Sequence, residues 1–374
     1  MIGATLFWAG FAIVFVSYLG YGMWVAWRAR WRPVPARAEY LPDDQLPAVT
    51  CVITAHDEAA ATLRKLRALD AQDYPRAKLR VVVVSDASTD GTDAVVAEWA
   101  ARDDRVRLLR NSQRQGKPTA LNRARPWIET EVAVFMDARQ DLTPRAVREL
   151  VAHLADPAVG VVSGDIRVRG DSYWTYEGFV RRCESRSGSM VQVTGSLYAI
   201  RTRDVPRLPP STILDDVYVP LTVALSGRRL VMAENAGSLD VVTRSIGNEF
   251  MRKVRTLAGL VQVCRLVEGC LDPARNPVWS RFVLHKLSRL ACPYALVMML
   301  AGAWMATGWL YAAALAGAAG LGLLALGAWA GIRSRLTALS QLFLALNLAA
   351  LWAPPAYFLG RASVTWTRVE TDRL

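Results

Sequence analysis

Uncharged apolar runs long enough to cross a bilayer flank a polar middle region. Residues 5–27 and 292–332 contain no charged side chain, and the second run is about twice as long as one membrane span. It predicts two helices that meet near residues 308–310, and residues 337–360 predict a further apolar segment with two adjacent prolines. The first run lacks the basic start and short apolar core of a cleaved signal peptide, which favours a membrane anchor over residues 1–27. We expect about three transmembrane segments within residues 289–360.

Within the polar region, apolar β-rich runs alternate with amphipathic helical patterns. Each predicted strand precedes a predicted helix: residues 48–54 and 57–72, 79–86 and 93–102, 105–110 and 118–128, and 131–137 and 144–154. Continuous apolar strands separated by helices are typical of a mainly parallel sheet covered by helices. We therefore predict an α/β domain over residues 48–240. Its flanks are a proline- and charge-rich linker over residues 28–47, an amphipathic segment over 241–288 and a tail over 361–374.

Arginines beside the apolar runs indicate which side of the membrane the polar region occupies. Arg28, Arg30 and Arg32 directly follow the first run, so the positive-inside rule places the α/β domain in the cytoplasm. Three further spans would export the C-terminal tail, whereas the arginines of that tail favour the cytoplasm. A last segment that re-enters the membrane at its two prolines would reconcile these signals, and the sequence leaves this open.

Composition and charge limit the classes of ligand and binding partner that we expect for the chain. The formal net charge is +12, but the basic residues are spread along the chain and form no tract interleaved with aromatic residues. We therefore expect no nucleic acid partner, and we attribute the charge to anionic membrane lipids and a phosphorylated substrate. The five cysteines form no CxxC pair and only three histidines are present, which argues against a zinc site.

Polar side chains follow the predicted strands at residues 56–58, 85–86, 111–117 and 137–141. The carboxyl ends of parallel strands lie at one edge of a sheet, where such folds bind ligands. A single aspartate in this position usually caps a helix or shapes a turn, but several on one edge predict a ligand site. No G-x-G-x-x-G follows the first strand, and the segment GKPT lacks the P-loop glycine where Asn111 stands. The first observation argues against a dinucleotide-dependent oxidoreductase, and the second excludes a P-loop.

Six segments occur together and in order: VITAHDEAAATLRKLRAL, VVVVSDASTDGT, RQGKPTALNRA, AVFMDARQDLTP, VTGSLYAIR and ILDDVYVPLTVALSGRRLVMAENA. Over residues 48–257 they resemble the membrane-bound family 2 glycosyltransferases, the group that contains bacterial exopolysaccharide synthases. The resemblance implies a GT-A fold and a location in the bacterial plasma membrane. It also implies a nucleoside-diphosphate-sugar donor, expected to be a UDP-sugar, and transfer with inversion at the anomeric carbon.

The resemblance assigns donor-binding roles to residues at the strand ends. Ala55 and Glu58 would contact the nucleoside, and Asp86 would accept hydrogen bonds from the base or the ribose. Ser85 stands where relatives often have an aspartate. Lys117, which follows a glycine, would meet the diphosphate; the alternative is a solvated loop lysine.

The family's metal-binding motif is altered. Many relatives hold a divalent metal with an Asp-x-Asp pair, and here Arg139 replaces the second aspartate after Asp137. One interpretation keeps a Mg²⁺ or Mn²⁺ ion held mainly through Asp137, with Asp141 as another carboxylate if the turn folds back. The other interpretation stabilises the diphosphate with Arg139 and Lys117 instead, because a guanidinium suits phosphate geometry.

The acceptor side is predicted from two further motifs. Asp216 occupies the position of the catalytic base, and its neighbour Asp215 would disfavour a second negative charge if both are buried. A helix N-cap is the alternative for one of the pair. Thr194 and Gly195 would let a sugar approach the backbone, and Trp174 would stack on a sugar face or pack its helix onto the sheet.

The amphipathic segment carries a modified form of the motif that closes the donor site in processive relatives. Those enzymes have Gln-x-x-Arg-Trp, and this chain has Arg252, Arg255 and Thr256 at its defined positions. The two arginines are three residues apart and share one helix face, so both would reach the diphosphate or rest on anionic lipid. Without the tryptophan, long-chain polymerisation is in doubt.

Together these patterns predict an inverting glycosyltransferase that moves a hexosyl or N-acetylhexosaminyl group to a growing polysaccharide or a lipid-linked acceptor. A non-processive enzyme that adds one sugar to a polyprenyl phosphate or glycolipid is the alternative within the class. An inactive, membrane-anchored nucleotide-sugar sensor is the alternative from another class, suggested by Ser85, Arg139 and Thr256.

Overall fold

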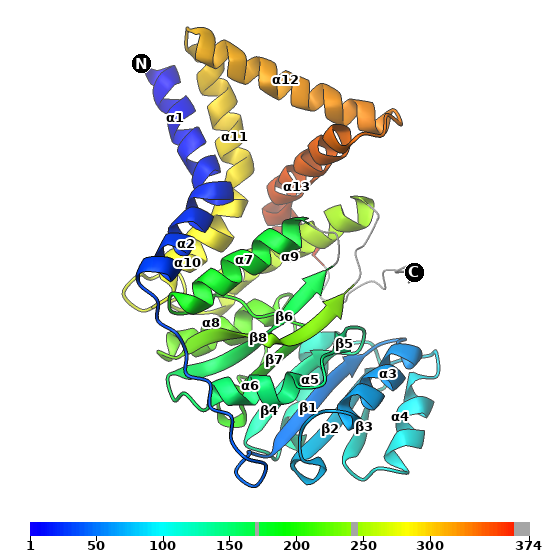
Figure 1. The fold of residues 1–374 in the computed structure, drawn as a ribbon. Coiled ribbons are helices and arrows are strands. Elements are labelled where there is room, and N and C mark those ends of the chain that lie inside the picture. Colours follow the sequence, from blue (N-terminus) through cyan, green and yellow to red (C-terminus); the bar gives the residue numbers. More distant parts are fainter. Residues whose placement is uncertain (169–171, 241–245, 363–374) are drawn as a thin grey trace. The chain divides into compact units, whose positions relative to one another are not determined.

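The computed structural model describes residues 1–168, 172–240 and 246–362 (Figure 1). The chain divides into two compact units. The helical unit comprises Met1–Trp24, Thr243–Gln262 and Ser280–Ser363. Of the described residues, the sheet unit comprises those within Val25–Val242 and Val263–Trp279. Each unit is described by itself below.

One eight-stranded sheet organises the sheet unit, with strand order β3-β2-β1-β4-β7-β6-β8-β5. The strands are β1 (Val49–Ala55), β2 (Leu79–Asp86), β3 (Val106–Asn111), β4 (Val132–Asp137), β5 (Asp141–Leu142), β6 (Val159–Val168), β7 (Leu197–Arg201) and β8 (Arg229–Asp240). Strands β1 to β4 are mutually parallel, as the sequence predicts. Their carboxyl ends therefore share one edge.

Strand β7 changes the direction of the sheet. It runs antiparallel to both β4 and β6, and Leu197 at its start pairs with Met136 near the end of β4. The backbone N–H of Asp137 accordingly donates to the carbonyl of Ser196 at 3.3 Å. This antiparallel step brings the residues just before β7 to the same edge as the ends of β1 to β4.

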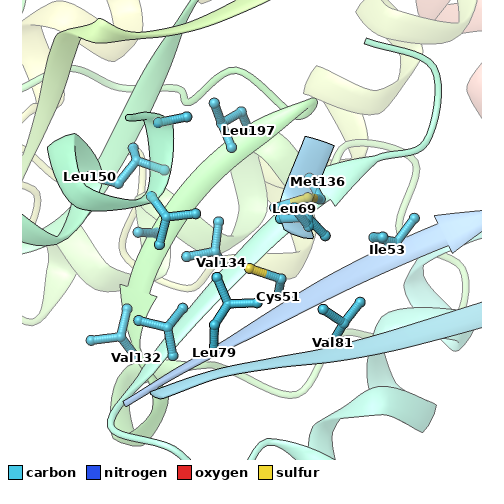
Figure 2. Packing of buried hydrophobic residues seen from close by; sticks show 14 of the residues in the cluster. Cys51, Ile53, Leu69, Leu79, Val81, Val132, Val134, Met136, Leu150 and Leu197 are labelled. Atoms are coloured by element: carbon cyan, nitrogen blue, oxygen red, sulfur yellow. The ribbon is translucent and has the colours of Figure 1, made fainter. Parts of the chain in front are cut away.

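Helices cover the sheet and complete its core. Those of the sheet unit are α3 (Ala59–Asp70), α4 (Thr92–Ala100), α5 (Lys117–Ala124), α6 (Ala146–Leu154), α7 (Ser172–Arg186) and α8 (Asp215–Leu225), with short 3₁₀ turns at Arg76–Lys78, Arg125–Trp127 and Thr202–Asp204. Cys51 of β1, Val134 of β4 and Leu150 of α6 belong to one buried apolar cluster (Figure 2). Burial of both sheet faces explains why these strands are apolar without alternation.

The helical unit contains apolar helices of membrane-spanning length. Its elements are α1 (Ile2–Phe15), a π-helical stretch (Val16–Gly20), α2 (Tyr21–Trp31, which continues into the sheet unit), α9 (Ile246–Leu266, likewise shared), α10 (Trp279–Arg281), a second π-helical stretch (Phe282–Leu287), α11 (Ser288–Met305), α12 (Trp309–Trp329) and α13 (Arg335–Phe358). Among the described residues, four helices are long and apolar enough to cross a membrane: Ile2–Trp31, Trp279–Met305, Trp309–Trp329 and Arg335–Phe358. This confirms one predicted segment before the α/β domain and three after it.

The two predicted interruptions of the apolar runs have different outcomes. A break does separate α11 from α12, and Gly308 within it has a φ of 131°, which favours glycine. In contrast, α13 continues through Pro354 and Pro355 to Phe358. The re-entrant break considered at these prolines is therefore wrong for this helix.

Glycines allow close packing between α1 and α11. A Cβ atom on Gly302 would lie 2.4 Å from the backbone nitrogen of Phe7, and one on Gly10 would lie 2.6 Å from the carbonyl oxygen of Ala295. Only residues without a side chain permit this approach, which is typical of helix pairs in membranes. In the same unit, Val254 of α9 packs with Ala349 and Ala356 of α13.

Candidate active site

The loops after β1 and β2 are tied to each other. Asp57 and Ala87 both adopt left-handed backbone conformations, with φ of 52° and 56°. Asp57 Oδ1 accepts a 2.6 Å hydrogen bond from the backbone N–H of Thr89, and this bond lowers the pKa of Asp57. Asp90 Oδ2 accepts from the N–H of Ala59 at 3.0 Å. These bonds fix the entrance to α3 and the turn before α4.

Asp86 organises the loop that leads to Lys117. Its buried carboxylate accepts hydrogen bonds from Asn111 Nδ2 at 2.8 Å and from the backbone N–H groups of Gln115 and Gly116 at 3.0 and 2.7 Å. The predicted contact of Asp86 with a base or ribose stays a prediction. What the structure adds is that this carboxylate shapes residues 111–116, and thereby sets the start of α5.

Lys117 lies between two carboxylates at the sheet edge. Its Nζ donates to Asp137 Oδ1 at 2.8 Å and to the carbonyl of Gly195 at 3.0 Å, and it is 3.4 Å from Asp215 Oδ2. Only 14% of the Lys117 side chain is exposed, so it is not the solvated loop lysine considered above. Burial lowers the pKa of Lys117, but Asp137 and Asp215 raise it more, and the net shift is upward. The side chain is therefore a fixed positive charge.

Two further cations surround the loop after β4. Arg139 Nε lies 2.8 Å from Glu58 Oε1, which orients the guanidinium from the end of β1. The buried ammonium of Lys65, in α3, donates to the carbonyl of Gln140. Burial lowers the pKa of Lys65 to about 8, although Asp137 and other acidic groups raise it. The segment that carries Asp137 is thus held by positive charge on several sides.

Asp137 offers a divalent metal a single protein carboxylate. Within residues 1–168, 172–240 and 246–362, no group of three or more His, Cys, Asp or Glu side chains could hold a metal ion. Asp137 is 35% exposed, and only its Oδ1 is engaged by Lys117. Asp141 is exposed in β5, 3.9 Å from Arg64 Nε. Asp137 would therefore be the protein ligand of such an ion, and donor phosphates and water would have to supply the other ligands.

Asp216 lies at the same edge, in the first turn of α8. Its Oδ2 accepts a 2.6 Å hydrogen bond from Gln192 Nε2. A Cβ atom on Gly195 would lie 3.2 Å from Asp216 Cβ and 3.7 Å from Lys117 Nζ, so the missing side chain of Gly195 leaves room where these two side chains approach each other. Burial and then the negative charge of Asp215 raise the pKa of Asp216.

The remaining predicted residues fall in different places. Ala55 is buried at the end of β1 beside Ser85. Thr194 is buried, and its hydroxyl accepts from Arg181 Nη1 of α7 at 2.9 Å. The Trp174 side chain lies outside the described residues. Arg252 and Arg255 are in α9, in the part assigned to the helical unit, where Arg252 pairs with Glu249. Their contact with the donor stays a prediction.

Sequence reasoning missed three polar residues near this edge. Lys65 occupies a position of α3 whose neighbours Leu66 and Leu69 are buried, so a lysine in the apolar stripe was the available signal. Gln192 interrupts the apolar run MVQV before Gly195, which was a similar signal. Arg181 is buried in α7 and bonds Thr194, a contact that helical spacing does not reveal.

Comparison with known proteins identifies the domain. Residues 50–199 match the sequence model of the family described as "Glycosyl transferase family 2". This part of the sheet unit is therefore similar to family 2 glycosyltransferase domains. Over its whole length the structure is similar to the mannosyltransferase PcManGT from Pyrobaculum calidifontis, solved in complex with GDP-Man and Mn²⁺. That likeness has a TM-score of 0.75 and 26% sequence identity, and it covers 96% of this chain and 99% of that one.

Curated glycosyltransferases show similarity over parts of the chain. Human polypeptide N-acetylgalactosaminyltransferase 15 is 33% identical over 34% of this chain, which spans only 20% of that protein. Glycosyltransferase AglE of Haloferax volcanii is 25% identical over 59% of this chain and 75% of its own length. An N-acetylglucosaminyltransferase of Rhizobium sp. is 24% identical over 63% of this chain and 58% of its own. The predicted likeness to family 2 is confirmed over residues 50–199, and so is the predicted GT-A-type α/β fold.

Proposed function

We propose that this family 2 glycosyltransferase inverts the anomeric carbon of a nucleoside-diphosphate-sugar and transfers the sugar to a polysaccharide or lipid-linked acceptor at a membrane. One observation carries the proposal: Lys117 joins Asp137 to Asp215, and the same ammonium and Asp216 both lie within 4 Å of the position that a Cβ atom on Gly195 would occupy. A donor-side carboxylate and a base candidate therefore share one edge of the sheet. Inverting transfer needs this arrangement, because attack and departure occur on opposite sides of one carbon.

Asp216 is proposed as the general base. It accepts the proton of the acceptor hydroxyl while that oxygen bonds to the anomeric carbon and the bond to the diphosphate breaks. Burial and Asp215 raise the pKa of Asp216, which makes it a stronger base than an exposed aspartate. Asp215 is buried and paired with Lys117. We therefore assign it an electrostatic role, in which its negative charge raises the pKa of Asp216.

Lys117 and Arg139 are proposed to face the departing diphosphate. The negative charge that develops on the leaving group is stabilised by cations that are already in place. A divalent ion, when bound through Asp137, would add further positive charge at the leaving oxygens. The Mn²⁺ in the PcManGT complex supports a metal in general, and Arg139 in place of a second aspartate supports a reduced role for it here.

The donor and the membrane location are also part of the proposal. We expect a UDP-sugar, and the GDP-Man in the PcManGT complex makes GDP-mannose the second donor to test. Four apolar helices support a membrane enzyme, and Arg28 and Arg30 in the last turn of the first helix, with Arg32 directly after it, support a plasma-membrane location with a cytoplasmic sheet unit. Thr256, in place of the family's tryptophan, favours the variant that adds one sugar to a polyprenyl phosphate or glycolipid.

A donor screen tests the proposal. The purified full-length chain in detergent is given UDP-glucose, UDP-N-acetylglucosamine or GDP-mannose with polyprenyl phosphate or an oligosaccharide acceptor, and nucleotide release is recorded with and without chelator. We expect release from one donor that depends on acceptor and is lost in Asp216→Asn, and an inverted linkage by NMR of the product. Donor binding without release in any combination would support the inactive sensor instead. Product length by mass spectrometry separates single addition from polymerisation.

A further inference from the structure

Gln192 donates a side-chain hydrogen bond to the carboxylate of Asp216. The residue lies in the segment between α7 and β7, and its Nε2 is 2.6 Å from Asp216 Oδ2. The next residue, Val193, donates its backbone N–H to the carbonyl of Asp216 at 3.1 Å. The segment is thus bonded to Asp216 twice, once through the backbone and once through a side chain.

The amide is suited to hold one oxygen of a carboxylate that must exchange a proton at the other. An ionised carboxylate only accepts hydrogen bonds, so the amide NH₂ faces it and donates. Glutamine does not titrate, and it therefore keeps this bond throughout a catalytic cycle in which Asp216 gains and loses a proton. A lysine or arginine in the same place would instead neutralise the base.

We propose that Gln192 is a positioning residue of the transfer reaction, which holds Asp216 Oδ2 and leaves Oδ1 to receive the proton of the acceptor hydroxyl. This inference rests on the proposed function. It assigns Gln192 no contact with the sugar or the diphosphate. Its effect is on the direction of the carboxylate and on its proton affinity, because a donor to the charged form favours that form.

The groups that shift the pKa of Asp216 predict the direction in which loss of the Gln192 amide should move that pKa. Burial and Asp215 raise the pKa of Asp216, whereas the Gln192 hydrogen bond and then Lys117 lower it. Removing the amide therefore raises the pKa of the base further. Removing an ordinary structural contact would lower the rate at every pH without moving the titration.

The test compares Gln192→Met, which nearly keeps the side-chain shape but has no donor, with the parent enzyme and with Gln45→Met. Gln45 is an exposed linker residue, so the same change there controls for handling and folding. Each protein is assayed for kcat and donor KM over a pH series, with the donor that gives the highest rate among UDP-glucose, UDP-N-acetylglucosamine and GDP-mannose. Gln192→Ala serves as a second variant, and unfolding temperatures confirm that each protein is folded.

We expect the acid limb of kcat for Gln192→Met to move up by about one pH unit and its plateau to fall by about tenfold, with donor KM changed less than about twofold. An unchanged acid limb in both folded Gln192 variants would overturn the inference alone. An equal loss in Gln45→Met would also overturn it. A parent enzyme that turns over no donor contradicts the proposed function itself, and the inference falls with it.

Discussion

The ammonium of Lys117 at the start of α5 lies 2.8 Å from Asp137 Oδ1 at the end of β4. The two residues come from different parts of the sheet edge, and Asp86 brings them together by holding the loop before α5. The pair fixes the side of the edge where we place the diphosphate. Lys117 also pairs with Asp215, whose neighbour in the chain, Asp216, is the proposed base.

Replacing Lys117 with Met should affect both stability and donor binding. Two partly buried carboxylates lose their cation, and breaking such a pair typically costs about 3 kcal/mol of unfolding free energy. We expect a lower unfolding temperature and a donor KM at least about tenfold higher. Thermal unfolding and initial rates measure these effects. The double variant Lys117→Met/Asp215→Asn should recover part of the stability, and no recovery would mean that the Asp215 contact is unimportant.

Asp216→Asn should separate catalysis from folding. We expect kcat to fall by at least about 100-fold, since the base is lost, with donor KM nearly unchanged. The pKa of Asp216 is raised in the folded state, so its ionisation opposes folding once the pH exceeds the unfolded value. The variant should therefore unfold at the same or a higher temperature at neutral pH, and this advantage should disappear at acid pH. A large drop in unfolding temperature would point to a structural role.

Asp215→Asn should move the pH profile in the opposite direction to Gln192→Met. The negative charge of Asp215 raises the pKa of Asp216, so its removal lowers that pKa. We expect the acid limb of kcat to shift to lower pH by up to about one unit. Parallel pH series of the two variants provide the comparison. Shifts of the same sign would contradict at least one of the two assigned effects on the pKa of Asp216.

Arg139→Ala tests whether the Arg139 guanidinium stabilises the diphosphate in place of the second aspartate of the Asp-x-Asp motif. The guanidinium is held by Glu58 at the end of β1, and we expect its loss to raise donor KM about tenfold because a phosphate contact disappears. Chelator titrations of parent and variant are compared, and the variant should be more sensitive. Activity that survives chelation in the parent but vanishes in Arg139→Ala would rule out the metal held through Asp137.

Gly302→Val tests the glycine contact of the helical unit. A Cβ atom there would lie 2.4 Å from the backbone nitrogen of Phe7, so α1 and α11 must separate. We expect about 3 kcal/mol of destabilisation, measured as a lower aggregation temperature in detergent. Gly317→Val is the matched control, because nothing lies within 4 Å of a Cβ atom at that glycine of α12. Equal effects in both variants would contradict the close contact.

Much of the fold was predictable because burial leaves a direct mark on the sequence. Residues 79–86 were predicted as a strand, and β2 has those bounds. The antiparallel insertion of β7 between β4 and β6 was not predictable, since apolar strands carry no record of their partner or direction. The same insertion places Gly195 beside Asp137 and Lys117. The geometry of the site therefore depends on the part of the sheet that the pattern specifies least.

The residues of the candidate site were predicted more completely than the hydrogen bonds and ion pairs that join them. Motif position identified Lys117, Asp137 and Asp216, which lie around one glycine. Their partners were not visible, because each hydrogen bond joins residues far apart in the chain: Gln192 with Asp216, and Lys117 with Asp215. Such pairings are decided by tertiary packing, and no local spacing rule reports them.

The close glycine contacts between α1 and α11 also bear on the order of biosynthesis. Helix α1 is translated first, yet the helix that covers its glycines is made only after every strand of the sheet. All strands of the sheet are therefore synthesised while α1 still lacks α11 as its packing partner. Packing of α1 against α11 can therefore begin only after the last strand of the sheet, β8, has been synthesised.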